Sequence, residues 1–281
     1  MGNISLLCAY NNESSFTELN YNDDEPVGMT NPFNGSFSHD WPLEDLISFK
    51  MTPKKSTLSI SNRSNRSLPV LATFTVGKGE STHRCALDIV CVIDHSDTMK
   101  QEKITLVEKT VEHLLEYLND YDRLSIIIVN NHVSRLTPLL RMNDKNKEKI
   151  IASFQDLPES GEVDLARGMN HAFRILKARK SMNSISSILL FSDGSDFGCQ
   201  EKIRHSLSLI GMETPFSINT FGFGYDHEKD VLTEIAEFKQ GKFFFIDKPE
   251  SIDRCLVECI GDLAIAVARE VNINIIPQSY Q

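Results

Sequence analysis

The fold is decided by one stretch of sequence, Asp88-Ile89-Val90-Cys91-Val92-Ile93-Asp94-His95-Ser96-Asp97-Thr98-Met99. Its continuous apolar run is typical of a strand that is buried on both faces of a sheet. The run ends at the carboxylate of Asp94, and the hydroxyls of Ser96 and Thr98 follow at even spacing. Functional side chains of open α/β sheets lie just beyond the carboxyl ends of such strands. Because all three side chains carry hard oxygen donors, they could bind Mg²⁺, Mn²⁺ or Ca²⁺.

The chain downstream of residue 86 alternates apolar strand segments with amphipathic helices. This pattern predicts a doubly wound α/β fold with a mostly parallel sheet and helices on both faces. The expected strands are 87–93, 123–129, 132–137, 186–192, 216–222 and 242–246, and the expected helices are 100–118, 144–156, 164–179, 199–210, 228–238 and 249–268. We also expect flanking strands at 57–60 and 70–76, and a segment at 270–276 that could pair with 70–76.

The chain divides by composition into a leader and a domain. Eight of its 39 acidic residues lie in residues 1–49, which hold none of the 29 Lys and Arg residues. Residues 1–66 are rich in Asn, Ser, Asp and Gly, so we expect an acidic leader that is mostly disordered or extended. Residues 67–281 form the expected domain with its flanking strands, and its core runs from about 86 to 268.

Two features of the leader bear on partners. Gly2 suggests N-myristoylation, with Cys8 as a second acylation site, but Leu6 stands where that motif requires Ser or Thr. We therefore do not expect membrane contact by acylation. The segment Asp40–Phe49 suggests a short helix, capped by Asp40 and carrying Trp41, Leu46 and Phe49, which would dock on a partner or pack on the domain itself.

Several functional classes are disfavoured by composition. The net charge of −10 argues against a nucleic-acid-binding surface, which needs a net basic footprint. No apolar run approaches the length of a membrane span, and the first residues lack the pattern of a secretory signal. The six Cys show neither C-x-x-C pairs nor zinc-finger spacing, so we expect reduced thiols in a cytoplasmic protein.

The motifs resemble those of von Willebrand factor type A domains. Residues 94–99 are similar to the D-x-S-x-S-M motif of that family, and Leu189-Leu190-Phe191-Ser192-Asp193-Gly194 is similar to its L-L-T-D-G motif. The pattern most resembles the A domains of plant RING-type proteins and of calcium-activated chloride channel regulator-like proteins, without the RING finger. The resemblance covers roughly residues 68–276 and implies a metal-ion-dependent adhesion site.

By this resemblance, the metal ligands are Asp94, Ser96, Thr98 and Asp193. The second loop departs from the family pattern G-G-T-D/N-I, because this chain reads Gly161-Glu162-Val163-Asp164-Leu165. Val163 replaces the expected Thr and offers no oxygen, although Asp97 or Glu162 could supply a carboxylate instead. Two alternatives stay open: one divalent cation at an altered site, or a relic site without metal. A relic site would bring Asp94 and Asp193 together, which requires a raised pKa or another cation.

The resemblance implies a protein–protein interaction module rather than an enzyme. In one mode, a bound cation captures an acidic side chain of the partner; in the other, the domain is a metal-independent scaffold in a larger assembly. An aspartate-based phosphohydrolase is a remote alternative, because such enzymes need a second Asp where this chain has Ser96. Ubiquitin ligase activity is not implied, since the chain has no Cys/His cluster able to hold zinc.

Overall fold

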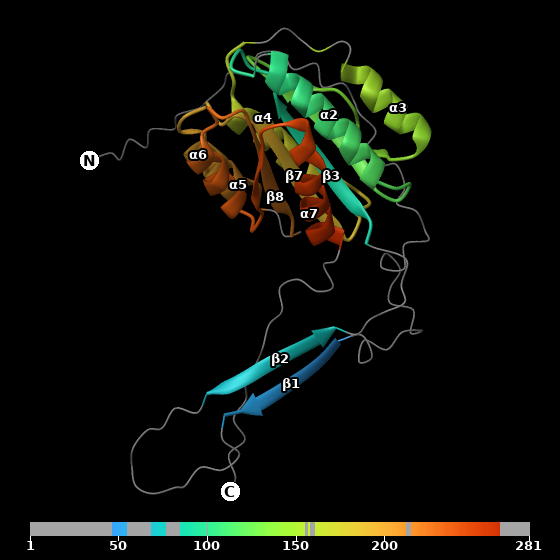
Figure 1. The fold of residues 1–281 in the computed structure, drawn as a ribbon, viewed down its shortest axis with the longest axis vertical. Helices are drawn as coiled ribbons and strands as arrows, with labels where there is room; N and C mark the ends of the chain where they lie inside the picture. Colours follow the sequence, from blue (N-terminus) through green and yellow to red (C-terminus); the bar gives the residue numbers. More distant parts are fainter. Residues whose placement is uncertain are drawn as a thin grey trace, which may run out of the picture.

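The computed structural model describes residues 47–54, 69–76, 85–99, 101–154, 157, 161–211 and 215–264. Within these ranges it contains a two-stranded sheet and a larger α/β body (Figure 1). The larger sheet has the strand order β5-β4-β3-β7-β8-β9, with β6 paired to β4. Its strands are β3 (Leu87–Asp94), β4 (Arg123–Val129), β5 (Val133–Arg135), β6 (Leu140–Arg141), β7 (Ile185–Ser192), β8 (Ser217–Phe223) and β9 (Phe243–Ile246).

Most of this sheet is parallel, as the sequence predicts. The pairings of β3 with β4 and β7, of β7 with β8, and of β8 with β9 are all parallel. Only β5 and β6 run antiparallel, and both pair with β4. Because the chain moves from β3 to β4 on one side and later to β7 on the other, the strand order reverses at β3. Ligands of open α/β sheets bind beyond the carboxyl ends of strands at such a reversal.

Helices cover both faces of the sheet. They are α2 (Gln101–Tyr117), α3 (Asp144–Ser153), α4 (Leu165–Ala178), α5 (Cys199–Ile210), α6 (Lys229–Glu237) and α7 (Ile252–Ala264), the last preceded by the 3₁₀ turn η2 (Pro249–Ser251). One apolar cluster joins α2 and α7 to one face of β3, and a second joins α4, α5 and α6 to the opposite face. Figure 1 shows α2 and α7 in front of the strands and α4 behind them. The doubly wound arrangement follows from strands that are apolar on both faces.

The predicted elements differ from the observed ones mainly at their ends. The strand expected at 132–137 is the short β5, and the two-residue strand β6 was not expected. The helix expected at 249–268 begins as a 3₁₀ turn and becomes α-helical at Ile252. The predicted strands 57–60 and 270–276 lie outside the described residues.

A strand, β1 (Ile47–Pro53), lies within the expected leader and pairs antiparallel with β2 (Val70–Val76). The helix expected from Asp40 therefore does not extend through Phe49, and this part of the prediction is wrong. The physical reason is the alternation of Ile47, Phe49 and Met51, which places apolar side chains on one face of a strand. Phe49 lies opposite Phe74, with 4.8 Å between the ring centroids. Cross-strand contact thus favours a strand at Phe49, while residues 40–46 lie outside the described residues.

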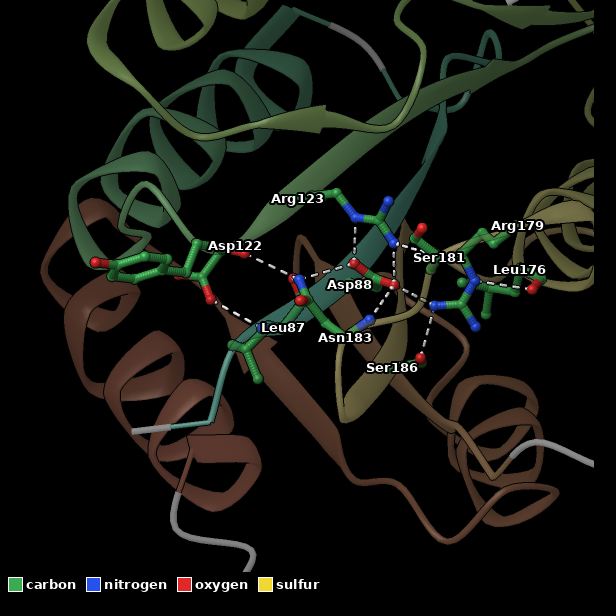
Figure 2. A network of polar contacts seen from close by, with 10 residues as sticks. Leu87, Asp88, Asp122, Arg123, Leu176, Arg179, Ser181, Asn183 and Ser186 are labelled. Carbon is green, nitrogen blue, oxygen red and sulfur yellow. Dashed lines mark hydrogen bonds and ion pairs between the residues drawn. The ribbon is translucent and has the colours of Figure 1, made fainter. Parts of the chain in front are cut away.

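A buried polar network joins the strands at the end of the sheet remote from Asp94 (Figure 2). Asp88 accepts two hydrogen bonds from Arg123, Nε to Oδ1 and Nη2 to Oδ2, each 2.7 Å long. It also pairs with Arg179, and the amide nitrogen of Asn183 donates to Asp88 Oδ1 at 3.0 Å. All three charged side chains are fully buried. Since β3, β4 and the segment between α4 and β7 each contribute a member, this network holds the amino ends of the strands together.

Candidate functional site

Asp94 lies at the carboxyl end of β3 and is fully buried. Its Oδ1 accepts a hydrogen bond from the backbone N–H of Ser96 at 2.9 Å, which folds the loop back on the strand. Its Oδ2 accepts from the hydroxyl of Ser192, at the end of β7, at 2.5 Å. Both oxygens are therefore engaged by the protein, and Asp94 joins its own loop to the neighbouring strand.

The predicted hydroxyl ligands lie close together on the same loop. Ser96 Oγ and Thr98 Oγ1 share a hydrogen bond of 2.9 Å, and Thr98 Oγ1 shares another of 2.9 Å with Ser195 Oγ. Ser96 is buried, whereas Thr98 is exposed. These hydroxyls thus form a chain that connects the loop after β3 to the loop after β7.

Asp193, the predicted second acidic ligand, is paired with a lysine. The Lys103 ammonium, from the first turn of α2, lies 2.8 Å from Asp193 Oδ2 and 2.9 Å from Asp226 Oδ1. Asp193 Oδ1 also accepts from the backbone N–H of Ser195 at 3.1 Å. Only 4% of the Asp193 side chain and 13% of the Lys103 side chain are exposed, whereas Asp226 is 74% exposed. Lys103 therefore shields Asp193 from solvent and bridges it to the loop after β8.

The second loop lies next to the first. Ser96 and Gly161 form an isolated parallel bridge, and the backbone N–H of Asp97 donates to the Gly161 carbonyl at 2.9 Å. Val163 is partly buried and packs against the apolar cluster under α4, while Glu162 is exposed. Thus the loop that carries a Thr hydroxyl in the family pattern here carries a valine, as expected from the sequence, and this valine packs against the core.

Electrostatics at Asp94 follow from its burial. Desolvation raises the pKa of Asp94 to about 6, although hydrogen bonds from Ser192 and Ser96 partly oppose the shift. The charge of nearby Asp193 raises this pKa further. Burial alone would lower the pKa of Lys103, but its hydrogen bonds to Asp193 and Asp226 raise that pKa overall. The site therefore places Asp94, a carboxyl with a raised pKa, next to the strand that carries Asp193, whose carboxylate is paired with an ammonium.

Four further residues of the site are not predicted from the sequence: Lys103, Ser192, Ser195 and Asp226. One signal was available for Lys103. A cation in the first turn of a helix is opposed by the positive end of the helix dipole, so it needs carboxylates close by. The nearest candidates in space are separated from it by 90 and 123 residues in sequence, which only the sheet topology brings together.

The family model for the von Willebrand factor type A domain matches residues 88–255. This chain belongs to that family. The family expected from the D-x-S-x-S-M motif is therefore confirmed, and so is the α/β fold. The A domain also resembles a solved von Willebrand factor type A protein from Catenulispora acidiphila, with a TM-score of 0.58 and 18% identity, over 76% of this chain and 49% of that one.

Curated relatives include plant and animal proteins. The E3 ubiquitin-protein ligase WAV3 of Arabidopsis thaliana is 30% identical over 223 residues, which cover 78% of this chain and 28% of WAV3. The voltage-dependent calcium channel subunit alpha-2/delta-3 of Rattus norvegicus is 26% identical, over 59% of this chain and 18% of that subunit. The chain thus spans less than a third of either relative.

The side chains of this A domain, as arranged, do not fit a resident divalent cation. A cation needs several oxygens with lone pairs directed at it. Here both oxygens of Asp94 and both of Asp193 accept hydrogen bonds from protein donors. Val163 has no oxygen to offer. The described residues contain no group of three or more His, Cys, Asp or Glu side chains that could hold a metal ion. Metal ligation by Asp94, Ser96, Thr98 and Asp193 stays a prediction.

The predicted partner-binding residues of the leader fall into two groups. Trp41 and Leu46 lie outside the described residues. Phe49 lies on β1, is 47% exposed and contacts Phe74. Among the helices that the structure describes, none is both long and apolar enough to cross a membrane.

Proposed function

We propose that this A domain is a protein-interaction module that binds its partner where β3, β7 and β8 end. Two exposed aromatic side chains on this face support the proposal. Phe197, in the loop after β7, is 71% exposed, and Tyr225, in the loop after β8, is 82% exposed. Large aromatic side chains are enriched among the residues that dominate the binding energy of protein interfaces. Phe197 follows Asp193 by four residues, and Tyr225 directly precedes Asp226; Lys103 bridges these two aspartates.

The charge of this face favours a partner with basic side chains. The loops 95–100, 161–164, 193–198 and 224–228 contain a single Lys or Arg residue, Lys100. Exposed carboxylates on them include those of Asp97, Glu162, Asp226 and Glu228. The acidic partner side chain expected from the family would need a bound cation to offset this charge. A partner segment with Arg or Lys beside an apolar residue matches the face directly.

An enzymatic role is not part of the proposal. A phosphoryl-accepting aspartate must be reachable by its substrate, whereas Asp94 is fully buried. The name of WAV3 assigns ligase activity to that protein, of which this chain matches 28%. We propose binding without catalysis, in the cytoplasm as the sequence predicts.

Site-specific photo-crosslinking tests the proposed face. A benzophenone amino acid is placed at position 197 or 225 in the full chain, and at Leu209 on α5 and Val257 on α7 as controls. These control positions are 71% and 53% exposed. We expect an adduct of one defined mass from positions 197 and 225 in cells that make the protein, and none from the controls. Equal adducts from all four positions would contradict a specific face.

Charge-reversal variants test whether the partner is basic, with the same crosslinking experiment. Asp97→Lys and Glu162→Lys should each reduce the yield of the adduct from position 225. Added salt should also reduce this yield in the chain without charge reversal. Glu237→Lys, at the far end of α6, is the matched control. An adduct that increases with Asp97→Lys would favour an acidic partner instead.

A metal-independent scaffold is the second candidate function, and the two-stranded sheet favours it. Phe49, Met51, Val70 and Phe74 share one face of this sheet by register, and each is 43% to 47% exposed. A two-stranded sheet is marginally stable unless its apolar face is covered. We propose that a partner protein of the assembly covers it. Phe49→Ser should abolish co-purification of that partner, whereas Lys50→Ser, on the opposite face, should not.

A further inference from the structure

Two carboxylates in one buried site need a compensating positive charge. Asp94 and Asp193 end neighbouring strands, and both side chains are almost completely buried. In an adhesion site of the family type, a divalent cation provides the compensation. The question for this chain is which group provides it.

The Lys103 ammonium lies where a positive charge is needed. Its Nζ donates to Asp193 Oδ2 at 2.8 Å and is within 3.0 Å of both oxygens of Asp226. Hydrogen bonds between ionised groups at such distances are among the strong ones in proteins. Because 13% of the side chain is exposed, water screens this interaction only weakly.

The backbone after β8 leaves room for the lysine. Gly224 has a φ of +82°, in the left-handed region, and a Cβ placed there would lie 2.6 Å from Lys103 Cε. The same Cβ would lie 2.7 Å from Asp226 Oδ1. Only glycine adopts this conformation readily and leaves this space. The loop therefore accommodates both the stem of Lys103 and its second carboxylate partner.

Val163, at the position of the family threonine in the second loop, supplies no metal ligand. The Val163 side chain packs against the apolar cluster beneath α4 and carries no oxygen that could bind a cation. The hydroxyls of Ser96 and Thr98 already bond to one another. A divalent cation would have to displace an ammonium and break hydrogen bonds of both carboxylates.

We propose that the Lys103 ammonium replaces the divalent cation in this A domain, so that the site is built to work without metal. The intramolecular ammonium has a fixed place on α2 and supplies one charge to Asp193, while both oxygens of Asp94 are held by hydrogen bonds from Ser96 and Ser192. The wild-type chain consequently has low affinity for divalent cations. A variant that lacks the ammonium and regains the missing hydroxyl should bind a divalent cation.

Manganese binding tests this proposal, with free Mn²⁺ followed by electron paramagnetic resonance on the full chain. The variants are Lys103→Met, Val163→Thr and the double variant, with Lys109→Met, on an exposed position of α2, as the matched control. We expect the double variant to bind one Mn²⁺ per chain at least about tenfold more tightly than wild type. Wild type, Lys109→Met and Val163→Thr should show no saturable binding at the same concentrations.

Thermal unfolding provides a second readout. Mn²⁺ should raise the unfolding temperature of Lys103→Met and of the double variant, because an added cation compensates Asp193, and should leave wild type unchanged. If Lys103→Met does not fold, Lys103→Gln retains a hydrogen-bond donor to Asp193 without the charge and takes its place.

Two outcomes would overturn the proposal. Saturable Mn²⁺ binding by wild type at the affinity of the double variant would show that Lys103 does not replace the metal. Binding by Val163→Thr alone would assign the loss of metal to the missing hydroxyl rather than to the ammonium. Metal binding is measured without a partner protein, so either result stands whether or not Phe197 and Tyr225 contact one.

Discussion

The hydroxyl of Ser192 donates a hydrogen bond of 2.5 Å to Asp94 Oδ2, across the boundary between β7 and β3. Ser192 Oγ in turn accepts from the backbone N–H of Gly194 at 2.9 Å. The family motif has Thr where this chain has Ser192, and here the hydroxyl fixes a buried acid. The connection joins the two strands at the reversal of strand order. The protonation of Asp94 should therefore affect the stability of the whole domain.

Asp94→Asn should change how stability depends on pH. The pKa of Asp94 is raised to about 6 in the folded state from 3.8, so the folded chain binds more protons than the unfolded chain between these pH values. The contribution of Asp94 to stability therefore falls as pH rises through this window and stays low above it. Asn is uncharged and can accept from Ser96 N–H and donate to Ser192 Oγ.

Urea unfolding at pH 4 and pH 8 measures this effect. Relative to wild type, Asp94→Asn should gain stability from pH 4 to pH 8, by up to about 3 kcal/mol for a shift of about two pKa units. Asp120→Asn, on an exposed turn, is the control and should follow wild type. A relative loss of stability for Asp94→Asn at pH 8 would mean that the ionised carboxylate is stabilising.

In the buried network around Asp88, replacing the carboxylate and replacing one arginine should reduce stability by different amounts. Asp88→Asn leaves Arg123 and Arg179 buried without a carboxylate, and breaking a buried pair in this way destabilises by about 3 to 5 kcal/mol. Arg179→Met should destabilise less, because the two hydrogen bonds between Arg123 and Asp88 remain (Figure 2). Arg179 Nη2 is buried without a hydrogen-bond partner, and burial lowers the pKa of Arg179.

Chemical unfolding of the two variants at pH 7 gives this ranking. Asp253→Asn, which breaks an exposed pair with His113, is the control and should change stability by less than about 1 kcal/mol. If Arg179→Met were the more damaging of the two network variants, the second arginine rather than the carboxylate would be the main support of the network.

The cysteines should differ in reactivity in the folded chain. Burial raises the pKa of the Cys199 thiol to about 12 and also raises that of the fully buried Cys91. Because the thiolate is the reactive form, both should resist iodoacetamide, whereas the partly exposed Cys85 should react. Peptide mass spectrometry before and after unfolding in urea checks this. Labelling of Cys91 in the folded chain would show that the strand opens more readily than its packing implies.

Much of the fold could be predicted because buried parallel strands have a strong apolar signature. The runs that end at Asp94 and Ser192 are followed directly by site residues, so the convergence of Asp94 and Asp193 followed from topology. The sequence also predicted that the second loop lacks a ligand oxygen, because Val163 stands in the place of a Thr. The position of the Lys103 ammonium could not be predicted, since its partners Asp193 and Asp226 follow two other strands. The strand β1 was missed because its alternation is short and its partner β2 follows only after an intervening segment.

Gly224→Ala should be more damaging than its backbone conformation alone explains. A side chain in the left-handed region costs about 1 to 2 kcal/mol. The Cβ at position 224 would also displace Lys103 and Asp226, whereas nothing lies within 4 Å of a Cβ at Gly198, which has a φ of +81°. Gly198→Ala is therefore a matched control that reports the backbone strain without the displacement.

A double-mutant cycle separates the two effects of Gly224→Ala. Shortening Lys103 to Ala removes the side chain that the new Cβ would meet, so Gly224→Ala should destabilise the Lys103→Ala chain less than wild type. We expect a coupling energy of about 1 to 3 kcal/mol from thermal or urea unfolding. The corresponding cycle of Gly198→Ala with Lys103→Ala should give additive effects. Additivity at Gly224 as well would mean that Lys103 does not depend on the space which this glycine leaves.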